Sequence, residues 1–365
     1  MDYAHYFNQH KLYKTAEIDV APCMRNLSNW HTAVEEISTW PKYTPQPLHA
    51  LPGLAKKLDI SQFYVKDESQ RFGAHLGSFK ALDAPYAIYQ LLAREVEQAT
   101  GIRPCAADLR TSKYHDVTQK VTVCVATDGN QGRGLAYGAQ LFGCRCIDYI
   151  HGHVSEGRAA RMKELGAIVI RIDGEYEHSV ARAREDARMN GWHFVSSTSW
   201  SDFDDGIPQD VMNAYMVSLN EALEAVSSVE DISHVFVCGG VGVGSIAAAI
   251  FQGFYTYLKA HDSSALPRFV LVEPSEADCL FQSASSGEAR QSSGSLRTIM
   301  AGLACRDPSP AAWKILKWLG SGFLTVPDAY ASNGMKALAC PSEGNIPFVI
   351  AVFEAQKRYR DANAG

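Results

Sequence analysis

Short apolar runs alternate with longer, more polar stretches between residues 121 and 273. The apolar runs predict buried strands at 121–126, 144–150, 167–172, 192–196, 234–238 and 268–273. The stretches between them predict helices at 131–142, 155–165, 176–190, 208–226 and 245–258, and glycines follow three of these: Gly143, Gly166 and Gly191. Strands that alternate with helices of about 10–15 residues indicate parallel βαβ units, so the predicted fold class is α/β.

The first 60 residues do not show this alternation of apolar runs and polar stretches. This segment is expected to be irregular, because four prolines mark extended or turn backbone: Pro41, Pro45, Pro47 and Pro52. The chain has 365 residues, which at about 150 residues per domain favours two domains. We expect a smaller α/β domain over 80–191, with 1–79 and 192–365 forming a larger one.

The formal net charge of −6 argues against a general affinity for nucleic acid or anionic membranes, because both need a basic excess. No stretch approaches the roughly 20 apolar residues of a spanning helix, and no secretory signal is visible at the N-terminus. A cytoplasmic protein is therefore expected.

The cysteines do not predict a disulfide framework, because nine is an odd count spread over the whole chain. Cys144 and Cys146 precede His151 and His153 closely enough to suggest a metal cluster. The alternation along 144–150 instead favours two small apolar side chains on one face of a strand, so no metal site is expected.

Two segments in the first half of the chain could carry chemistry. Ser78 can cap a helix with Lys80 in its first turn, where a desolvated lysine becomes a usable amine nucleophile; the alternative is an ordinary surface lysine. The second segment follows a buried strand: Thr127-Asp128-Gly129-Asn130-Gln131-Gly132. Its glycines allow a tight turn that exposes N–H groups to a carboxylate or phosphate, although an ordinary βα turn has a similar composition.

A third segment is richer in glycine: Gly239-Gly240-Val241-Gly242-Val243-Gly244-Ser245. It lies between a strand and a helix, which is the arrangement of a phosphate-binding loop. It lacks the Gly-Lys-Ser/Thr of a Walker loop and the spacing of a dinucleotide fingerprint, and glycines needed only for helix packing are a further alternative.

Taken together, these segments resemble the fold-type II pyridoxal-phosphate enzymes, the superfamily of the tryptophan synthase β chain. Within it the match is best to the diaminopropionate ammonia-lyase family. The resemblance runs from about residue 40 to about residue 350 and rests on 77–82, 126–133, 272–280, 298–305 and 333–335. It implies a two-domain architecture, pyridoxal 5'-phosphate as cofactor, a small amino acid as substrate and a homodimer.

Carried over by position, the resemblance implies that Lys80 forms the internal aldimine and that Asn130 contacts the pyridoxal 3-hydroxyl. The loop 239–245 would hold the phosphate, and Asp128 would act as general base near the substrate α-carbon. The substrate-binding residues expected around them are Ser78, Thr127, Gly129 and Gln131. The implied reaction is α-proton abstraction followed by loss of a β-substituent.

The chain departs from the family pattern at several positions. Gln131 stands where relatives usually have histidine, and Ser197 where the ammonia-lyases carry an aspartate that serves as a second base. The phosphate loop is two residues longer. A last strand with a hydroxyl residue for the pyridine nitrogen has no counterpart, so either a group near 340–345 replaces it, the electron sink is weakened, or the chain is shortened.

The best interpretation is a lyase that performs β-elimination, with β-replacement in a biosynthetic pathway left open. A non-catalytic or regulatory descendant of the fold is the first alternative, and a nucleotide-binding dehydrogenase is the second. A yellow protein bleached by borohydride would distinguish the enzyme from both.

Overall fold

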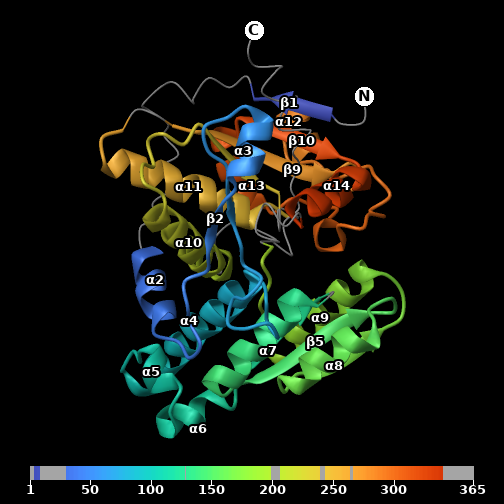
Figure 1. Cartoon of the computed structure of the whole chain (residues 1–365). Coiled ribbons are helices and arrows are strands. Elements are labelled where there is room, and N and C mark those ends of the chain that lie inside the picture. Colours follow the sequence, from blue (N-terminus) through green and yellow to red (C-terminus); the bar gives the residue numbers. More distant parts are fainter. Residues whose placement is uncertain are drawn as a thin grey trace.

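The computed structural model describes residues 4–8, 30–127, 129–198, 206–238, 243–263 and 266–339. Two four-stranded sheets form separate layers, with helices packed around each of them (Figure 1). A small two-stranded sheet pairs β2 (Leu48–Ala50) with β3 (Tyr64–Lys66).

The first sheet is parallel throughout and has the strand order β6-β5-β4-β7. Its strands are β4 (Thr122–Ala126), β5 (Arg145–His151), β6 (Ile168–Ile172) and β7 (His193–Phe194). The helices that connect them are α7 (Asn130–Phe142), α8 (Glu156–Glu164) and α9 (Tyr176–Asn190). Along β4, Val123 and Val125 share a core with α7, whereas Cys124 and Ala126 pack with α9. Both faces are thus covered, which explains why every position of β4 is buried and all but Thr122 are apolar.

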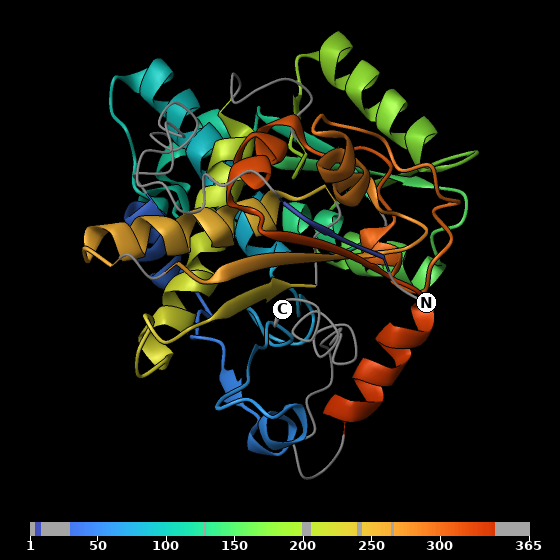
Figure 2. The same ribbon diagram turned by 90° about the horizontal axis from the view of Figure 1, so that it is seen from above.

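The second sheet has the order β1-β10-β9-β8 (Figure 2). Three strands are parallel: β8 (His234–Val237), β9 (Arg268–Pro274) and β10 (Gly322–Val326). The edge strand β1 (Ala4–Phe7) runs antiparallel to β10, and the Asn8 side chain just after it donates to the Lys317 carbonyl oxygen at 2.8 Å. The helices of this part are α11 (Ser245–Ala260), α12 (Cys279–Ser286), α13 (Pro310–Leu319) and α14 (Asp328–Leu338), with a 3-10 turn at Ala301–Leu303.

Helices α4 (Lys80–Thr100) and α10 (Ile207–Ala225) pack on each other between the two sheets (Figure 1). Helix α4 also packs on α7, and two glycines of α7 permit the close approach. A Cβ added to Gly134 would lie 2.3 Å from the Lys80 carbonyl oxygen, and one added to Gly138 would lie 2.7 Å from Pro85 Cα. The start of α4 is therefore held directly against α7.

The strands and helices expected between residues 121 and 273 are confirmed to within two residues at each end. The expectation that the first 60 residues are irregular is wrong. Helix α2 (Trp30–Ser38) buries Trp30, Ala33 and Ile37 against the core, and α3 (Pro52–Leu58) begins at one of the prolines. Three shorter helical segments lie between α4 and β4, at Ala106–Leu109 (α5), Ser112–Tyr114 and His115–Thr118 (α6).

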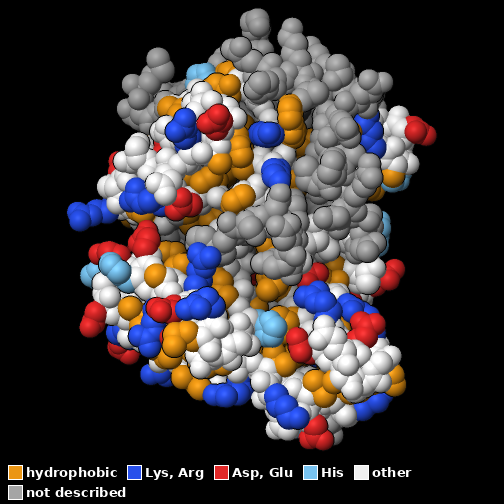
Figure 3. All heavy atoms as spheres, turned by 180° about the vertical axis from the view of Figure 1, so that it is seen from behind, with side chains coloured by type: hydrophobic (Ala, Val, Ile, Leu, Met, Phe, Trp, Pro, Cys, Tyr) orange, Lys and Arg blue, Asp and Glu red, His pale blue; other side chains and the backbone are white. Residues whose placement is uncertain are grey.

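The expected division into domains at 80–191 stays a prediction. Strand β7 begins at His193, just past that boundary, and belongs to the first sheet. In the described part of the chain, no helix combines the length and the apolar character needed to cross a membrane. On the face drawn in Figure 3, basic and acidic side chains are interspersed over the described surface.

The two neighbouring cysteines pack as small side chains. Cys146 on β5 is buried, and Cys144 lies just before that strand, half-buried. Over the described ranges, no group of three or more His, Cys, Asp or Glu residues is arranged to hold a metal ion.

Candidate active site

Lys80 is the first residue of α4, and its amine lies among polar side chains. Nζ lies 3.0 Å from Ser197 Oγ and 3.0 Å from the Tyr215 hydroxyl, and the Lys80 side chain is 19% exposed. These contacts bring together the start of α4, the segment after β7 and the middle of α10. The amine is thus oriented by its neighbours and still reachable from solvent.

Ser78 lies two residues before Lys80 and supports the start of the helix. Its hydroxyl accepts the Lys80 backbone N–H at 3.2 Å, although Phe79, not Ser78, occupies the capping position. The expectation that Ser78 is the N-cap is therefore wrong by one residue, while its bond to an otherwise unpaired N–H of the first turn is present.

A buried carboxyl group lies beside the Lys80 amine. Asp83 is fully buried, and its Oδ2 is 3.5 Å from Lys80 Nζ and accepts a hydrogen bond from the Tyr215 hydroxyl at 2.5 Å. Burial raises the pKa of Asp83, while the charge of Lys80 and the Tyr215 hydrogen bond oppose that shift. Burial also raises the pKa of Tyr215, and the charge of Asp83 adds to the effect.

The loop after β4 is organised by Thr127. Its Oγ1 accepts the backbone N–H groups of Gly129 at 3.0 Å and Gly132 at 2.9 Å, so this buried hydroxyl shapes the turn into α7. Gly129 has a φ of 148°, a value that favours glycine. Asp128, the predicted base, lies outside the described residues.

Asn130 and Gln131 begin helix α7 and differ in their surroundings. Asn130 is exposed, and its Oδ1 accepts a hydrogen bond from Arg133, whose other nitrogen donates to the His75 carbonyl oxygen at 2.9 Å. Both polar atoms of the Gln131 amide are buried, and neither has a hydrogen-bond partner among the described residues. A buried amide with unused donors and acceptors is rare in a protein interior and is typical of a group that meets a ligand.

The glycine-rich loop is described only at its end. Gly239, Gly240, Val241 and Gly242 lie outside the described residues. Gly244 has a φ of 98° and caps α11, and the Val243 carbonyl oxygen accepts the Ser309 N–H at 2.8 Å. Ser245, the first residue of α11, donates its hydroxyl to the Ser197 carbonyl oxygen at 2.6 Å. Because Ser197 also contacts Lys80, the structure joins the end of this loop to the lysine.

Two of the groups around Lys80 were missed by the sequence analysis. Asp83 lies three residues after Lys80 in a helix, so the spacing alone places both on one face. Tyr215 is 135 residues away from Lys80, and no local pattern connects the two.

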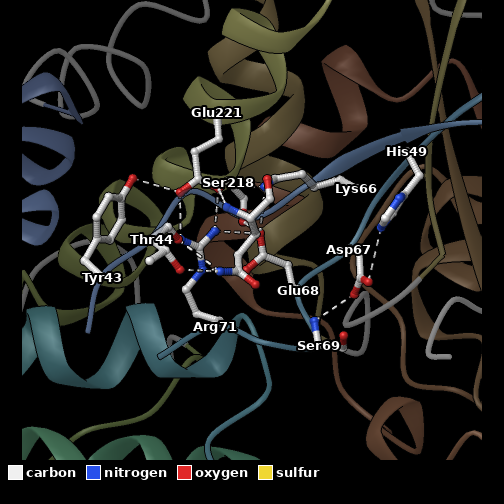
Figure 4. A network of polar contacts seen from close by, with 11 residues as sticks. Tyr43, Thr44, His49, Lys66, Asp67, Glu68, Ser69, Arg71, Ser218 and Glu221 are labelled. Atoms are coloured by element: carbon white, nitrogen blue, oxygen red, sulfur yellow. Dashed lines mark hydrogen bonds and ion pairs between the residues drawn. The ribbon is translucent and has the colours of Figure 1, made fainter. Parts of the chain in front are cut away.

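A second polar cluster fixes the segment that leads into α4 (Figure 4). Arg71 is fully buried; its Nη1 donates to Glu221 Oε1 and its Nη2 to Glu221 Oε2, both at 2.7 Å. It also donates twice to Glu68, and Lys66 Nζ reaches Glu221 Oε2 at 2.6 Å. The two cations and two anions balance, so this cluster ties the segment after β3 to α10 without leaving a buried charge alone.

A surface pocket of about 330 Å³ lies elsewhere, between α2, α10 and α11. Trp30, Leu223 and Tyr257 are among its lining residues, and none of the predicted site residues lines it. We therefore locate the candidate site at Lys80 and not at this pocket.

Comparison with known proteins shows the family of the chain. The family model described as pyridoxal-phosphate dependent enzyme matches residues 39–344. The chain is 34% identical to diaminopropionate ammonia-lyase of Escherichia coli over 85% of its own length and 74% of that protein.

Two solved structures of that Escherichia coli enzyme have similar folds. The selenomethionine holo form gives a TM-score of 0.77 at 29% identity, covering 97% of this chain and 84% of that one. The complex with an aminoacrylate–PLP azomethine reaction intermediate gives a TM-score of 0.73 at 28% identity, covering 97% and 84%.

Proposed function

The chain belongs to the family of pyridoxal-phosphate dependent enzymes, and from that premise we propose that Lys80 binds the cofactor covalently through Nζ. The cofactor is pyridoxal phosphate, and the reaction class is that of an ammonia-lyase that eliminates a β-substituent. The observation that carries the assignment of Lys80 is its amine, half enclosed and held between Ser197 and Tyr215.

The residues present fit this cofactor. Gln131 offers two unpartnered polar atoms next to the loop after β4. Helix α11 has 16 residues, and its N-terminus begins beside Ser197, so its free N–H groups and dipole favour a phosphate there. A side chain at Gly244 would meet Leu316 Cδ1 at 2.9 Å, which keeps this helix start bare and close to α13.

When bound, pyridoxal phosphate supplies an electron sink for the substrate α-carbon. In the proposed arrangement, loop 239–245 with Ser245 holds the phosphate, and Asn130 contacts the ring hydroxyl. The Lys80 amine, once released, can hold a proton at Nζ, and Asp128 is proposed as the general base. Thr127 and Gly129 shape the loop that faces the substrate, and Ser78 and Gln131 remain proposed substrate contacts.

The proposed substrate is a small amino acid with a leaving group on its β-carbon, with 2,3-diaminopropionate as the first to test. The 34% identity to diaminopropionate ammonia-lyase supports it. The serine at position 197 gives the site a hydroxyl where the ammonia-lyases are expected to have a carboxylate, so β-replacement with an added nucleophile is tested beside elimination.

Replacement of Lys80 with alanine tests the assignment. The K80A variant should lose the visible absorbance band of bound pyridoxal phosphate and all ammonia release from 2,3-diaminopropionate, with an unchanged circular dichroism spectrum. Lys57→Ala, at an exposed lysine in the last turn of α3, is the matched control and should keep both. A K80A protein that retains the band would refute the role of Lys80.

We also propose a homodimer and a cytoplasmic location. The homodimer follows from the family resemblance and is tested by analytical ultracentrifugation. The location follows from the net charge and the sequence pattern and is tested by cell fractionation.

A further inference from the structure

The Lys80 amine has three polar neighbours among the described residues, and one of them is a fully buried acid. Asp83, Tyr215 and Ser197 surround Nζ at 3.5, 3.0 and 3.0 Å. Asp83 is also bound from its other side, because its Oδ1 accepts the Ala84 N–H at 2.5 Å. Its carboxyl group is thus fixed in direction, with Oδ2 turned to both the lysine and the tyrosine.

We propose that Asp83 and Tyr215 form a positioning pair that orients the Lys80 amine and places a carboxyl group beside its nitrogen. This inference rests on the proposed role of Lys80 and extends it to two residues that no comparison assigns. The Tyr215 hydroxyl donates to Asp83 Oδ2 and accepts from Lys80 Nζ. It therefore connects the acid to the amine and fixes the direction in which the Lys80 side chain extends from α4.

Among the described residues, the charged groups near this pair, apart from Lys80, interact with other partners. Helix α10 contributes Tyr215, the segment after β7 contributes the uncharged Ser197, and α7 presents Gly134 to the start of α4. Charged groups further along α4 pair elsewhere: Arg94 with Asp210 and Glu95 with His193. On the α2 side, the charge of Glu36 adds to the burial that raises the pKa values of Tyr86 and Tyr89. Lys80 and Tyr215 are the titratable groups that face Asp83 in the described structure.

The pair also accounts for the serine at position 197. A serine hydroxyl carries no charge and cannot stabilise a protonated amine as a carboxylate does. In this chain the carboxyl group nearest to Lys80, within the described ranges, comes from its own helix one turn later. The first turn of a helix favours a negative charge, which supports the ionised form of Asp83 against the cost of burial.

The reactivity of the Lys80 amine towards an acylating reagent is the quantity that tests the pair. We would label the full chain, freed of pyridoxal phosphate, with an amine-acylating reagent between pH 6 and pH 10 and quantify modified Lys80 by mass spectrometry. Only the unprotonated amine reacts, so the rate rises with pH and its midpoint can be compared between variants. Asp83→Asn should lower this midpoint by about one unit or more, because an opposite charge at this distance has effects of that size. Tyr215→Phe should lower it by a smaller amount.

Asp210→Asn is the matched control, since it removes a carboxylate from the same α4–α10 contact without touching Lys80. Its midpoint should equal that of the wild type. A folded Asp83→Asn protein with the wild-type midpoint would overturn the proposal; if that variant does not fold, an unchanged midpoint in Tyr215→Phe does so.

The same variants loaded with pyridoxal phosphate give a second readout. The pH at which the visible band changes should move downward in Asp83→Asn in step with the labelling midpoint. If the wild type forms no band that depends on Lys80, the proposed cofactor role fails, whereas the labelling of the cofactor-free chain still decides the influence of Asp83.

Discussion

Two buried acids lie on the neighbouring helices α10 and α4, and their pKa values are shifted in opposite directions. Glu221 on α10 receives Arg71 and Lys66, and the bonds and charges of these cations outweigh burial and lower its pKa. Asp83 on α4 has one cation at 3.5 Å and one hydroxyl, and burial raises its pKa despite them. Both acids are buried, Asp83 more completely than Glu221, so its deeper burial and its fewer, more distant cationic partners act in the same direction.

Glu221 stabilises the fold through Arg71, whereas the proposed role of Asp83 is to orient the reactive amine of Lys80. The Arg71 cluster is closed, because its cations and anions satisfy one another and solvent does not reach Arg71. The Asp83 cluster has a single cation, Lys80, whose side chain is 19% exposed, similar to the 17% of Lys66 at the rim of the Arg71 cluster. The same kind of substitution, a carboxylate to its amide, should therefore affect stability in one cluster and Lys80 in the other.

Glu221→Gln should have the largest effect on stability. It leaves the buried Arg71 guanidinium without its main partner, and breaking a buried pair in this way costs about 3–5 kcal/mol. Because the pKa of Glu221 is lowered in the folded state, the wild-type contribution is present above about pH 4.5, its unperturbed pKa, and is lost as the pH falls further. Denaturant unfolding at pH 7 and at pH 4 measures both effects.

Glu97→Gln is the control for that variant. Glu97 pairs with Arg103 at 2.8 Å, but both side chains are more than 40% exposed, so the loss should stay below about 1 kcal/mol. Equal losses in the two variants would contradict the distinction between closed and exposed pairs.

Gly134→Ala should have an intermediate effect on stability, which acts through the start of α4. Its Cβ would lie 2.3 Å from the Lys80 carbonyl oxygen, a backbone atom, so α4 must shift; such overpacking costs about 1–3 kcal/mol. We expect weaker binding of pyridoxal phosphate as well, measured by absorbance titration. Gly157→Ala, in α8 with no neighbour within 4 Å, should be neutral or stabilising by up to about 1 kcal/mol.

Asp83→Asn should have the smallest effect on stability, at most about 1 kcal/mol at pH 7, since an amide can still accept the Tyr215 hydrogen bond. The pKa of Asp83 is raised in the folded state, so the wild type loses stability as the pH rises above 3.8, its unperturbed pKa. The variant lacks this loss, so its stability relative to the wild type should increase as the pH rises above about 4. A loss as large as that of Glu221→Gln would remove the contrast between the two acids.

The sequence predicts the part of the fold whose signals are local. Apolar runs and glycine stops locate β4 to β9 and the helices between them, and three motif segments indicate the lysine and its loops. Helix α2 lies in a proline-containing part of the sequence, and its only local signal is the helical spacing of the apolar residues Trp30, Ala33 and Ile37. Tyr215 and Ser197 meet Lys80 because α10 and the segment after β7 pack beside α4, and such contacts arise from tertiary structure alone.

Strand β1 has a consequence for the time course of folding. It closes the second sheet by pairing with β10, and Asn8 just after it is bonded to Lys317, 309 residues further along the chain. At roughly 5–20 residues per second, a ribosome needs on the order of 15–60 s to make the intervening chain. Residues 4–8 therefore cannot pair until this interval has passed, and the β10 edge of the sheet is covered only after Lys317 has been made.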